Sequence, residues 1–140
     1  MSLVIWDTNL FIYLLEDYQG LSERVGALRR RMLTRGDRLC TSTLTLGEVL
    51  VKPSESGDRE LQYRFEELLQ RGADLIPFDA NAARHYAEIR ADRSIRPPDA
   101  LQLACAASAG VDLFITNDDR LRLKVIRGIQ FLTSLDRADL

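Results

Sequence analysis

The sequence contains little of what several protein classes depend on. Its 140 residues include two cysteines and one histidine, too few for a disulfide-rich domain and without the spacing of a zinc site. No apolar run approaches the roughly 18 residues that a membrane-spanning helix needs. No basic segment precedes the first apolar stretch, as a secretory signal would require. We therefore expect a cytoplasmic protein in which Cys40 and Cys105 are reduced and buried.

Charge and composition exclude further classes. The formal net charge is −2, so bulk charge alone does not indicate a nucleic-acid binder. There is no internal repeat and no low-complexity tract, and the segment "KPSESGD" (Lys52–Asp58) is expected to be a surface loop. A chain of this length with 46% hydrophobic residues can bury a sizeable core. We expect one domain spanning residues 1–140.

What the sequence does contain is an alternation of short and long apolar segments. Short runs predict strands at residues 3–6, 38–42, 74–78, 111–116 and 129–133, and segments with helical spacing lie between them. Gly36 and Gly72 are expected to stop two of these helices, and Pro53 a third. The alternation predicts an α/β fold with three α/β/α layers, in which helices flank a mainly parallel central sheet.

An aspartate follows the first predicted strand, in "LVIWDTNLFIYLLE". A buried, unpaired carboxylate costs several kcal/mol or takes up a proton. Asp7 therefore requires a turn bond, a helix cap or a bound cation, and Thr8 and Asn9 are the candidate caps of the helix that follows. Taken alone, a turn bond explains Asp7 as well as a function does.

More acids fall near the carboxyl ends of predicted strands, where open parallel sheets bind ligands. Asp118 and Asp119 follow the fourth strand, and Glu48 and Asp99 lie near helix starts. Each has a simpler explanation: a capping box from Thr45 to Glu48, a helix dipole at Asp99, a turn at Asp118 or Asp119. As a set, however, converging acids favour a bound cation. Oxygen ligands without nearby His or Cys suit Mg²⁺ or Mn²⁺.

Four segments resemble, in order and spacing, the acidic motifs of PIN-domain ribonucleases, particularly VapC-type toxins of toxin–antitoxin pairs: "IWDTNLFIYLLE", "TLTLGEVL", "RPPDALQLACAASAG" and "LFITNDDRL". The resemblance implies a PIN-like fold and Mg²⁺- or Mn²⁺-dependent hydrolysis of RNA phosphodiesters by a metal-activated water. It also implies a homodimer and a VapB-type antitoxin partner. The catalytic, metal-binding acids it implies are Asp7, Glu48, Asp99 and Asp118, supported by Thr8, Asn9, Thr116 and Asp119. Asp118 aligns better than Asp119, but the choice between them stays open.

Arginines cluster along the chain, and solvated helix faces are their simplest explanation. Arg96 and Arg120 adjoin the acidic motifs, so they are the candidates for contact with RNA phosphates. His85, the single histidine, lies far in sequence from those motifs and is expected to be an ordinary helix residue.

Three other functions remain as alternatives to the toxin. One is a PIN-type nuclease of RNA processing or of DNA that has no antitoxin, and another is a non-catalytic PIN-like binding module. An aspartyl phosphatase of the haloacid dehalogenase type would need a second aspartate where Asn9 stands.

Overall fold

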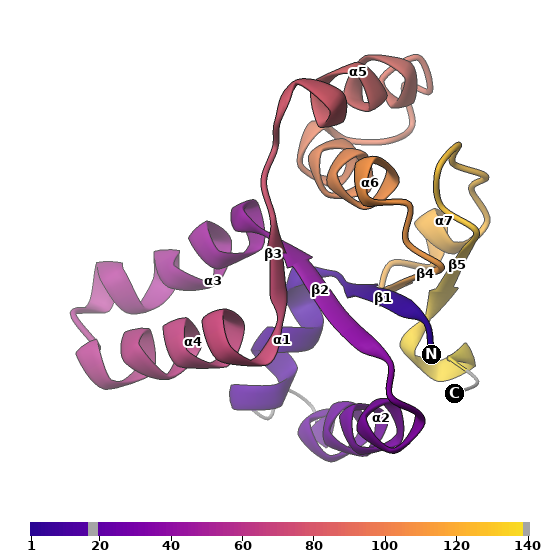
Figure 1. Ribbon diagram of the computed structural model, residues 1–140. Coiled ribbons are helices and arrows are strands. Elements are labelled where there is room, and N and C mark those ends of the chain that lie inside the picture. Colours follow the sequence, from indigo (N-terminus) through magenta and orange to yellow (C-terminus); the bar gives the residue numbers. More distant parts are fainter. Residues whose placement is uncertain (17–19, 139–140) are drawn as a thin grey trace.

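The apolar runs form one parallel sheet of five strands in the computed structural model, which describes residues 1–16 and 20–138 (Figure 1). The strands are β1 (Leu3–Trp6), β2 (Arg38–Ser42), β3 (Asp74–Ile76), β4 (Leu113–Thr116) and β5 (Phe131–Ser134). Their order is β3-β2-β1-β4-β5, and each neighbouring pair is parallel. The predicted α/β fold class is therefore confirmed, and β3 is a short strand at the edge of the sheet, where a proline such as Pro77 is tolerated.

The order in which the chain adds strands to the sheet reverses at β1. The chain extends the sheet from β1 through β2 to β3, and then returns to place β4 and β5 on the other side of β1. Trp6 of β1 pairs in register with Ile115 of β4, and the backbone N–H of Asp7 donates to the carbonyl of Ile115 at 2.9 Å. The residues that follow β1 and β4 therefore lie side by side at the carboxyl edge, where α/β sheets bind ligands.

Helices cover both faces of the sheet because successive residues of a strand point to opposite sides. Val4 and Trp6 belong to one buried apolar cluster, and Ile5 belongs to the other. The first cluster includes residues of α1 (Thr8–Leu15) and α2 (Ser22–Arg35), and the second includes residues of α5 (Ala80–Ile89) and α6 (Pro97–Ala109). Figure 1 shows these two pairs of helices on opposite sides of the strands.

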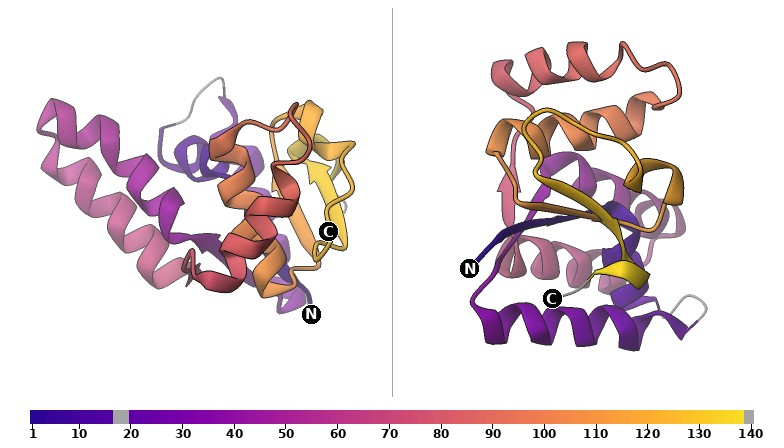
Figure 2. Two further views of the ribbon diagram at one scale, coloured as in Figure 1. Left: turned by 90° about the horizontal axis from the view of Figure 1, so that it is seen from above. Right: turned by 90° about the vertical axis from the view of Figure 1, so that its right-hand side faces the viewer.

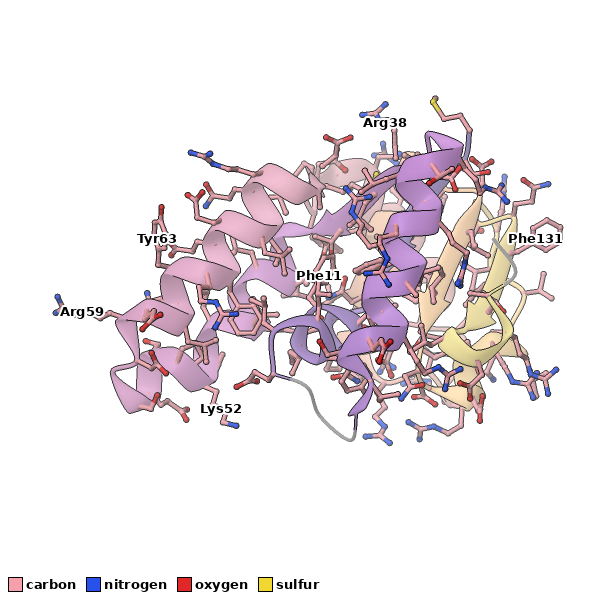
Figure 3. All side chains as sticks on the ribbon, turned by 90° about the horizontal axis from the view of Figure 1, so that it is seen from below. Phe11, Arg38, Lys52, Arg59, Tyr63 and Phe131 are labelled. Atoms are coloured by element: carbon pink, nitrogen blue, oxygen red, sulfur yellow. The ribbon has the colours of Figure 1, made fainter. Side chains whose placement is uncertain are left out.

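Helices α3 (Thr43–Ser56) and α4 (Arg59–Gly72) form a hairpin that extends away from the sheet (Figure 2). Phe65 and Leu69 of α4 are buried against the rest of the first cluster. Figure 3 shows Arg59 and Tyr63 on the projecting part, with Phe131 of β5 on the opposite side of the molecule.

Both buried cysteines are free, as predicted. Burial raises the pKa of Cys40 and of Cys105 to about 11, so neither thiol is activated as a nucleophile. Within the described residues, no helix combines the length and apolar character needed to cross a membrane.

Two expectations about α3 were wrong. The segment Lys52–Asp58 is not a loop, because α3 continues through Pro53 to Ser56. Proline lies in the last turn of the helix and removes only one internal hydrogen bond there, which the flanking packing tolerates. Gly57 ends the helix instead, with φ of 70°, a conformation that glycine adopts without strain.

The other helix ends follow the sequence closely. Gly36 ends α2 with φ of 76°, whereas Gly72 is the last residue of α4 rather than the residue after it. The short helix α7 (Asp119–Arg122) was not predicted, because four residues are too few to show a helical period. A 3₁₀ turn, Leu135–Arg137, follows β5.

Candidate active site

Asp7 follows β1, and its two carboxylate oxygens contact α1 and β4. Oδ1 accepts a hydrogen bond from the backbone N–H of Thr8 at 2.7 Å, and Oδ2 accepts one from the Thr116 hydroxyl at 2.9 Å. The helix cap that we considered for Asp7 is therefore present. The capping residue of α1 is Asp7 itself, so the prediction of Thr8 or Asn9 as the cap was wrong.

These hydrogen bonds do not outweigh the effect of burial on Asp7. The pKa of Asp7 is raised, mainly by burial and further by the negative charges of Asp99 and Glu48. The hydrogen bonds from Thr116 and Thr8 act in the opposite direction. Among the described residues, no cation contributes to this shift. The folded protein therefore disfavours the charged form of Asp7 relative to water, and an added cation would offset that penalty.

Glu48 lies in the second turn of α3 and faces α1 and α6. Its Oε1 accepts a hydrogen bond from the Thr8 hydroxyl at 2.9 Å and another from the Gln102 side-chain amide at 2.8 Å. The predicted capping box is wrong: α3 begins at Thr43, before Thr45, and its N-cap is Ser42, whose hydroxyl accepts from the Thr45 N–H at 3.2 Å. Glu48 is thus free of a capping role.

Asp99 lies in the first turn of α6, directly after two prolines, as predicted. Burial raises its pKa, and the charges of Asp118 and Glu48 act in the same direction, while Arg120 and Arg96 oppose them. The helix dipole explanation is compatible with this position. It does not explain why Asp7, Glu48 and Asp118 all interact electrostatically with Asp99.

Asp118 is the N-cap of α7 and is held by Arg120. Its Oδ1 accepts from the backbone N–H and Nε of Arg120, both at 3.0 Å, and its Oδ2 accepts from Nη2 at 2.7 Å. The Arg120 side chain is the main reason that the pKa of Asp118 is lowered. Asp119 instead pairs with Arg122, and its side chain is 80% exposed. Of the two adjacent acids, Asp118 is the one that interacts with Asp99.

The predicted supporting residues differ in what they contact. Thr116 is fully buried and contacts both Asp7 and the backbone N–H of Asp118. Thr8 is buried and donates to Glu48. Asn9 is exposed, and its side chain makes no hydrogen bond within the described part of the chain. The structure thus brings Thr8 and Thr116 to the acids and leaves Asn9 outside their hydrogen bonds.

Two polar residues of this region were missed by sequence reasoning. Gln102 is a single polar residue within a mostly apolar stretch of helix, and its side-chain amide contacts Glu48. Asn117 donates from Nδ2 to the Tyr13 hydroxyl at 3.1 Å and so links the end of β4 to α1. The signal for Asn117 was its position after a strand, whereas nothing local to the sequence indicated Gln102.

Two hollows in the surface adjoin the acids. One, of about 340 Å³, borders Glu48, and the other, of about 190 Å³, borders Asp99 and Asp118. The first is lined by Ile12, Glu16, Glu48, Val49, Lys52 and Pro53. The second is lined by Ser94, Asp99, Asp118, Arg120, Leu121 and Lys124. Glu48, Asp99 and Asp118 therefore line surface hollows, whereas Asp7 lines neither of these two.

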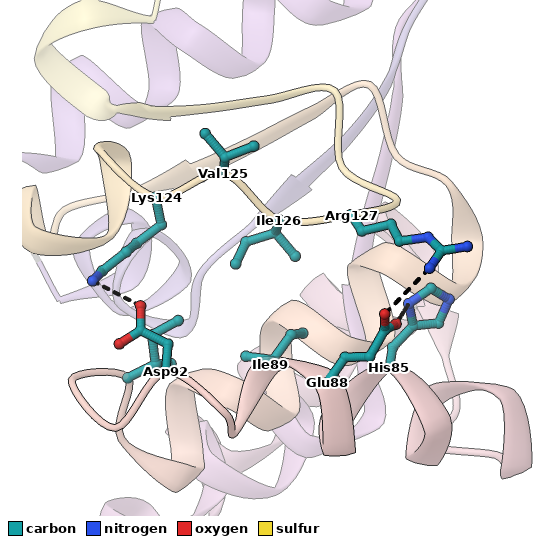
Figure 4. Close-up of a pocket in the computed structure, with 9 residues that line it drawn as sticks. His85, Glu88, Ile89, Asp92, Lys124, Val125, Ile126 and Arg127 are labelled. Atoms are coloured by element: carbon teal, nitrogen blue, oxygen red, sulfur yellow. Dashed lines mark hydrogen bonds and ion pairs between the residues drawn. The ribbon is translucent and has the colours of Figure 1, made fainter.

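A separate pocket of about 270 Å³ lies between α5 and the chain after α7 (Figure 4). His85 lines it, and its charged walls are paired: Lys124 contacts Asp92 at 2.9 Å, and Arg127 contacts Glu88 at 3.3 Å. None of the four predicted acids lines this pocket. The expectation that His85 takes no part in the acidic site agrees with this position.

The acids and hydroxyls match the ligands of a hard divalent cation. The donors are carboxylate oxygens, and the pKa values of Asp7 and Asp99 are raised first by burial and then by neighbouring acids, a penalty on their charged forms that a cation would relieve. Within the described ranges, however, no three acidic, histidine or cysteine side chains are close enough together to hold a metal ion as they stand. Asp118 is turned onto Arg120, so binding a cation at all four acids requires Asp118 to exchange partners.

The parallel sheet and the acids at its point of reversal define an α/β protein with an acidic site at the carboxyl edge. Residues 4–126 match the PIN domain family, and the chain therefore belongs to that family. The predicted resemblance is confirmed. The tRNA(fMet)-specific endonuclease VapC of Shigella flexneri is 27% identical over 119 residues, covering 81% of this chain and 85% of that protein.

Solved structures share the fold. VapBC2 from Rickettsia felis, bound to a DNA fragment from its promoter, matches with a TM-score of 0.77 and 17% identity over 94% of this chain and 98% of that chain. DNA-bound VapBC from Salmonella typhimurium matches with a TM-score of 0.69 and 24% identity, over 96% and 99% of the two chains.

Proposed function

We propose that this chain is an endoribonuclease toxin of the VapC type, dependent on Mg²⁺ or Mn²⁺. The observation that carries the proposal is that Asp7, Asp99 and Glu48 influence each other electrostatically at the reversal point of a PIN-domain sheet. Three acids in mutual repulsion are a binding site for a cation rather than a source of stability. The related VapC of Shigella flexneri is named as an endonuclease of tRNA(fMet), which supports RNA as the substrate class.

The side chains would divide the work as follows. Asp7, Glu48, Asp99 and Asp118 hold the cation, which when bound polarises a phosphodiester and lowers the pKa of water. Thr116 fixes the orientation of Asp7 by donating to Oδ2 at 2.9 Å. Such hydrogen bonds to ligating carboxylates hold them in the productive direction.

Arginines next to the acids are suited to the phosphates of the substrate. Arg120 lines the hollow beside Asp99 and Asp118, and Arg96, the N-cap residue of α6, lowers the pKa of both acids. Both guanidinium groups are therefore close to the position where a phosphodiester would meet the cation. Arginine binds phosphate oxygens with two parallel hydrogen bonds, so we assign RNA binding to these two residues.

The partner would be a VapB-type antitoxin, and we expect a homodimer in the cytoplasm. Support for the antitoxin comes from the solved relatives, which are VapBC toxin–antitoxin complexes. Expression of this chain alone should arrest growth, and co-expression with a small adjacent gene should restore it. Growth arrest that the adjacent gene does not relieve would favour a PIN-type nuclease without an antitoxin. Light scattering of the purified protein tests the dimer.

The activity itself is tested with purified protein and RNA. Cleavage should require Mg²⁺ or Mn²⁺, should stop on addition of EDTA, and should be lost in Asp7→Asn. Asp79→Asn is the matched control, because Asp79 is also a helix N-cap, accepting from the Ala82 N–H at 2.9 Å, but belongs to α5. Cleavage that survives both EDTA and Asp7→Asn would refute the proposal, and a protein that never cleaves RNA or DNA would be a binding module.

A further inference from the structure

Gln102 is a buried polar residue in a helix that otherwise contributes small and apolar side chains. Its side chain is 3% exposed, and it lies one turn after Asp99 in α6. Glutamine is seldom buried without hydrogen-bond partners, because an unsatisfied amide in the interior is costly. The partners of Gln102 therefore indicate what it does.

The amide of Gln102 joins three helices. Its Nε2 lies 2.8 Å from Glu48 Oε1, 2.8 Å from Thr45 Oγ1 and 3.2 Å from Thr8 Oγ1, and its Oε1 lies 2.7 Å from the Ser42 hydroxyl. Ser42 and Thr45 are fully buried. Because Nε2 carries two hydrogens, the two short contacts, to Glu48 and Thr45, are the hydrogen bonds that it donates.

Counting hydrogens fixes the direction of the whole network. Ser42 accepts from the Thr45 N–H, so its own hydrogen goes to Gln102 Oε1. Thr8 gives its hydrogen to Glu48 Oε1, so Thr45, 3.1 Å from Thr8, donates to Thr8. The opposite amide orientation would place the Gln102 carbonyl against the Glu48 carboxylate, where two acceptors repel. Every chain of donors therefore ends on Glu48 Oε1.

This arrangement leaves one carboxylate oxygen of Glu48 for the site. The hydrogen bonds that described residues make to Glu48 all reach Oε1. Two donors on one oxygen restrict the rotation of the carboxylate, and they leave Oε2 without a hydrogen bond from the described residues. Glu48 would otherwise be free to turn away from Asp7 and Asp99, whose charges repel it.

We propose that Gln102 is a positioning residue that holds Glu48 in the direction needed for cation binding, an inference that rests on the function proposed above. It ties the helix that carries Asp99 to the helix that carries Glu48. Loss of such a partner of a ligating carboxylate typically weakens metal binding by about 10–100-fold.

Gln102→Met tests this with a side chain of similar length and no donors. We expect Mn²⁺, titrated by calorimetry, to bind about 10–100-fold more weakly. Gln102→Asn is the second variant: it keeps an amide in the polar surroundings but is one carbon too short to reach Glu48, so it should show the same loss. Gln70→Met is the matched control, because Gln70 is exposed on α4, and its Mn²⁺ affinity should not change.

Thr45→Val separates positioning from stability. This change removes the acceptor for Gln102 and the donor to Thr8, and it leaves in place the two hydrogen bonds that reach Glu48, from Thr8 and Gln102. It should lower the melting temperature. The Mn²⁺ affinity should stay within about 3-fold of wild type, a much smaller change than the loss that follows removal of a partner of a ligating carboxylate. A purely structural role for Gln102 predicts instead that both Gln102 variants melt earlier and bind Mn²⁺ as wild type does.

The outcome for wild type distinguishes the two proposals. Wild type that binds Mn²⁺, together with Gln102 variants that bind it equally well, overturns the role of Gln102 and leaves the proposed function intact. Wild type that binds neither Mn²⁺ nor Mg²⁺ overturns the proposed function, and the role of Gln102 with it.

Discussion

Three of the four acids form two groups, an inner half and an outer half, that the protein supports in different ways. The inner half, Asp7 and Glu48, is held by donors: Thr116 on Asp7, and Thr8 and Gln102 on Glu48. The outer half, Asp118 with Arg120, is a surface ion pair closed by three hydrogen bonds. Hydroxyl and amide donors orient a charge without cancelling it, whereas a guanidinium cancels it.

The difference indicates where the protein requires a cation. Asp7 has a raised pKa, mainly from burial, and Asp118 has a lowered pKa, mainly from Arg120. An external cation therefore gains most at the inner half, where no internal cation competes. At the outer half it must displace Arg120, which then becomes available to a phosphate.

The largest effect is expected at Glu48, because it belongs to the inner half and has no capping role. Glu48→Gln keeps the shape of the side chain and removes the charge. The rate of RNA cleavage should fall by more than about 10–100-fold, which is the loss expected when a residue that only orients a metal ligand is removed. Steady-state cleavage rates measure this, with Glu67→Gln as control, since Glu67 pairs with Arg71 on α4. An equal loss in both variants would show that the effect is not specific to the site.

The two halves should also respond to pH with opposite signs when a chelator is present. The folded-state pKa of Asp7 is raised, so its favourable contribution is complete below the unfolded value of about 3.9 and is lost as pH rises through the folded pKa. Asp7→Asn should therefore gain stability relative to wild type between about pH 3 and pH 7.

For Asp118 the folded-state pKa is lowered. Its contribution is present above the unfolded value of about 3.9 and is lost as pH falls through the folded pKa. Asp118→Asn should be less stable than wild type at pH 7, with a difference that disappears in acid. The effect is smaller than at Asp7, because the surface position screens the ion pair. Melting temperatures across pH test both signs, and equal signs would contradict the division into halves.

A smaller effect, on RNA binding, is expected when the positive charge of Arg120 in the outer half is removed. Arg120→Gln should weaken RNA binding and reduce the slope of log affinity against log salt by about 0.7, the value for one phosphate of a single strand. Binding of a non-cleavable RNA analogue, measured with Mg²⁺ present at several salt concentrations, gives the slope without catalysis. Arg127→Gln is the control, because Arg127 pairs with Glu88 at the separate pocket. An unchanged slope would remove Arg120 from the RNA-binding surface.

The smallest effect should come from Asp119→Asn. Asp119 pairs with Arg122 in exposed α7, and its side chain is directed to solvent. Surface pairs of this kind contribute about 0–1 kcal/mol, so cleavage and melting temperature should stay close to wild type. A loss as large as that of Asp118→Asn would reverse the preference between these two adjacent acids.

Most of the fold could be predicted because its signals are local. Buried parallel strands appear as short apolar runs, and Gly36 and Gly110 end their helices in the left-handed conformation that glycine favours. Pro53 misled us because its usual effect depends on position, and in a last helical turn it removes a single hydrogen bond.

The site was predicted less completely because part of it is not local. Asp7 and Asp118 could be found since each follows a strand. Gln102 could not, because its partners, Ser42, Thr45 and Glu48, lie more than 50 residues away in sequence. The pairing of Asp118 with Arg120 rather than with another acid also depends on how α7 is placed at the end of β4.

The central claim is that the inner half requires an external cation, and thermal unfolding with Mn²⁺ tests it most directly. A ligand of the native state stabilises it by RT ln(1 + [L]/Kd), about 2.7 kcal/mol at 100 times Kd. The account predicts that wild type melts progressively later as Mn²⁺ is added, and that Asp7→Asn does not respond. A wild-type melting temperature that Mn²⁺ leaves unchanged, or an equal rise in Asp7→Asn, would contradict it.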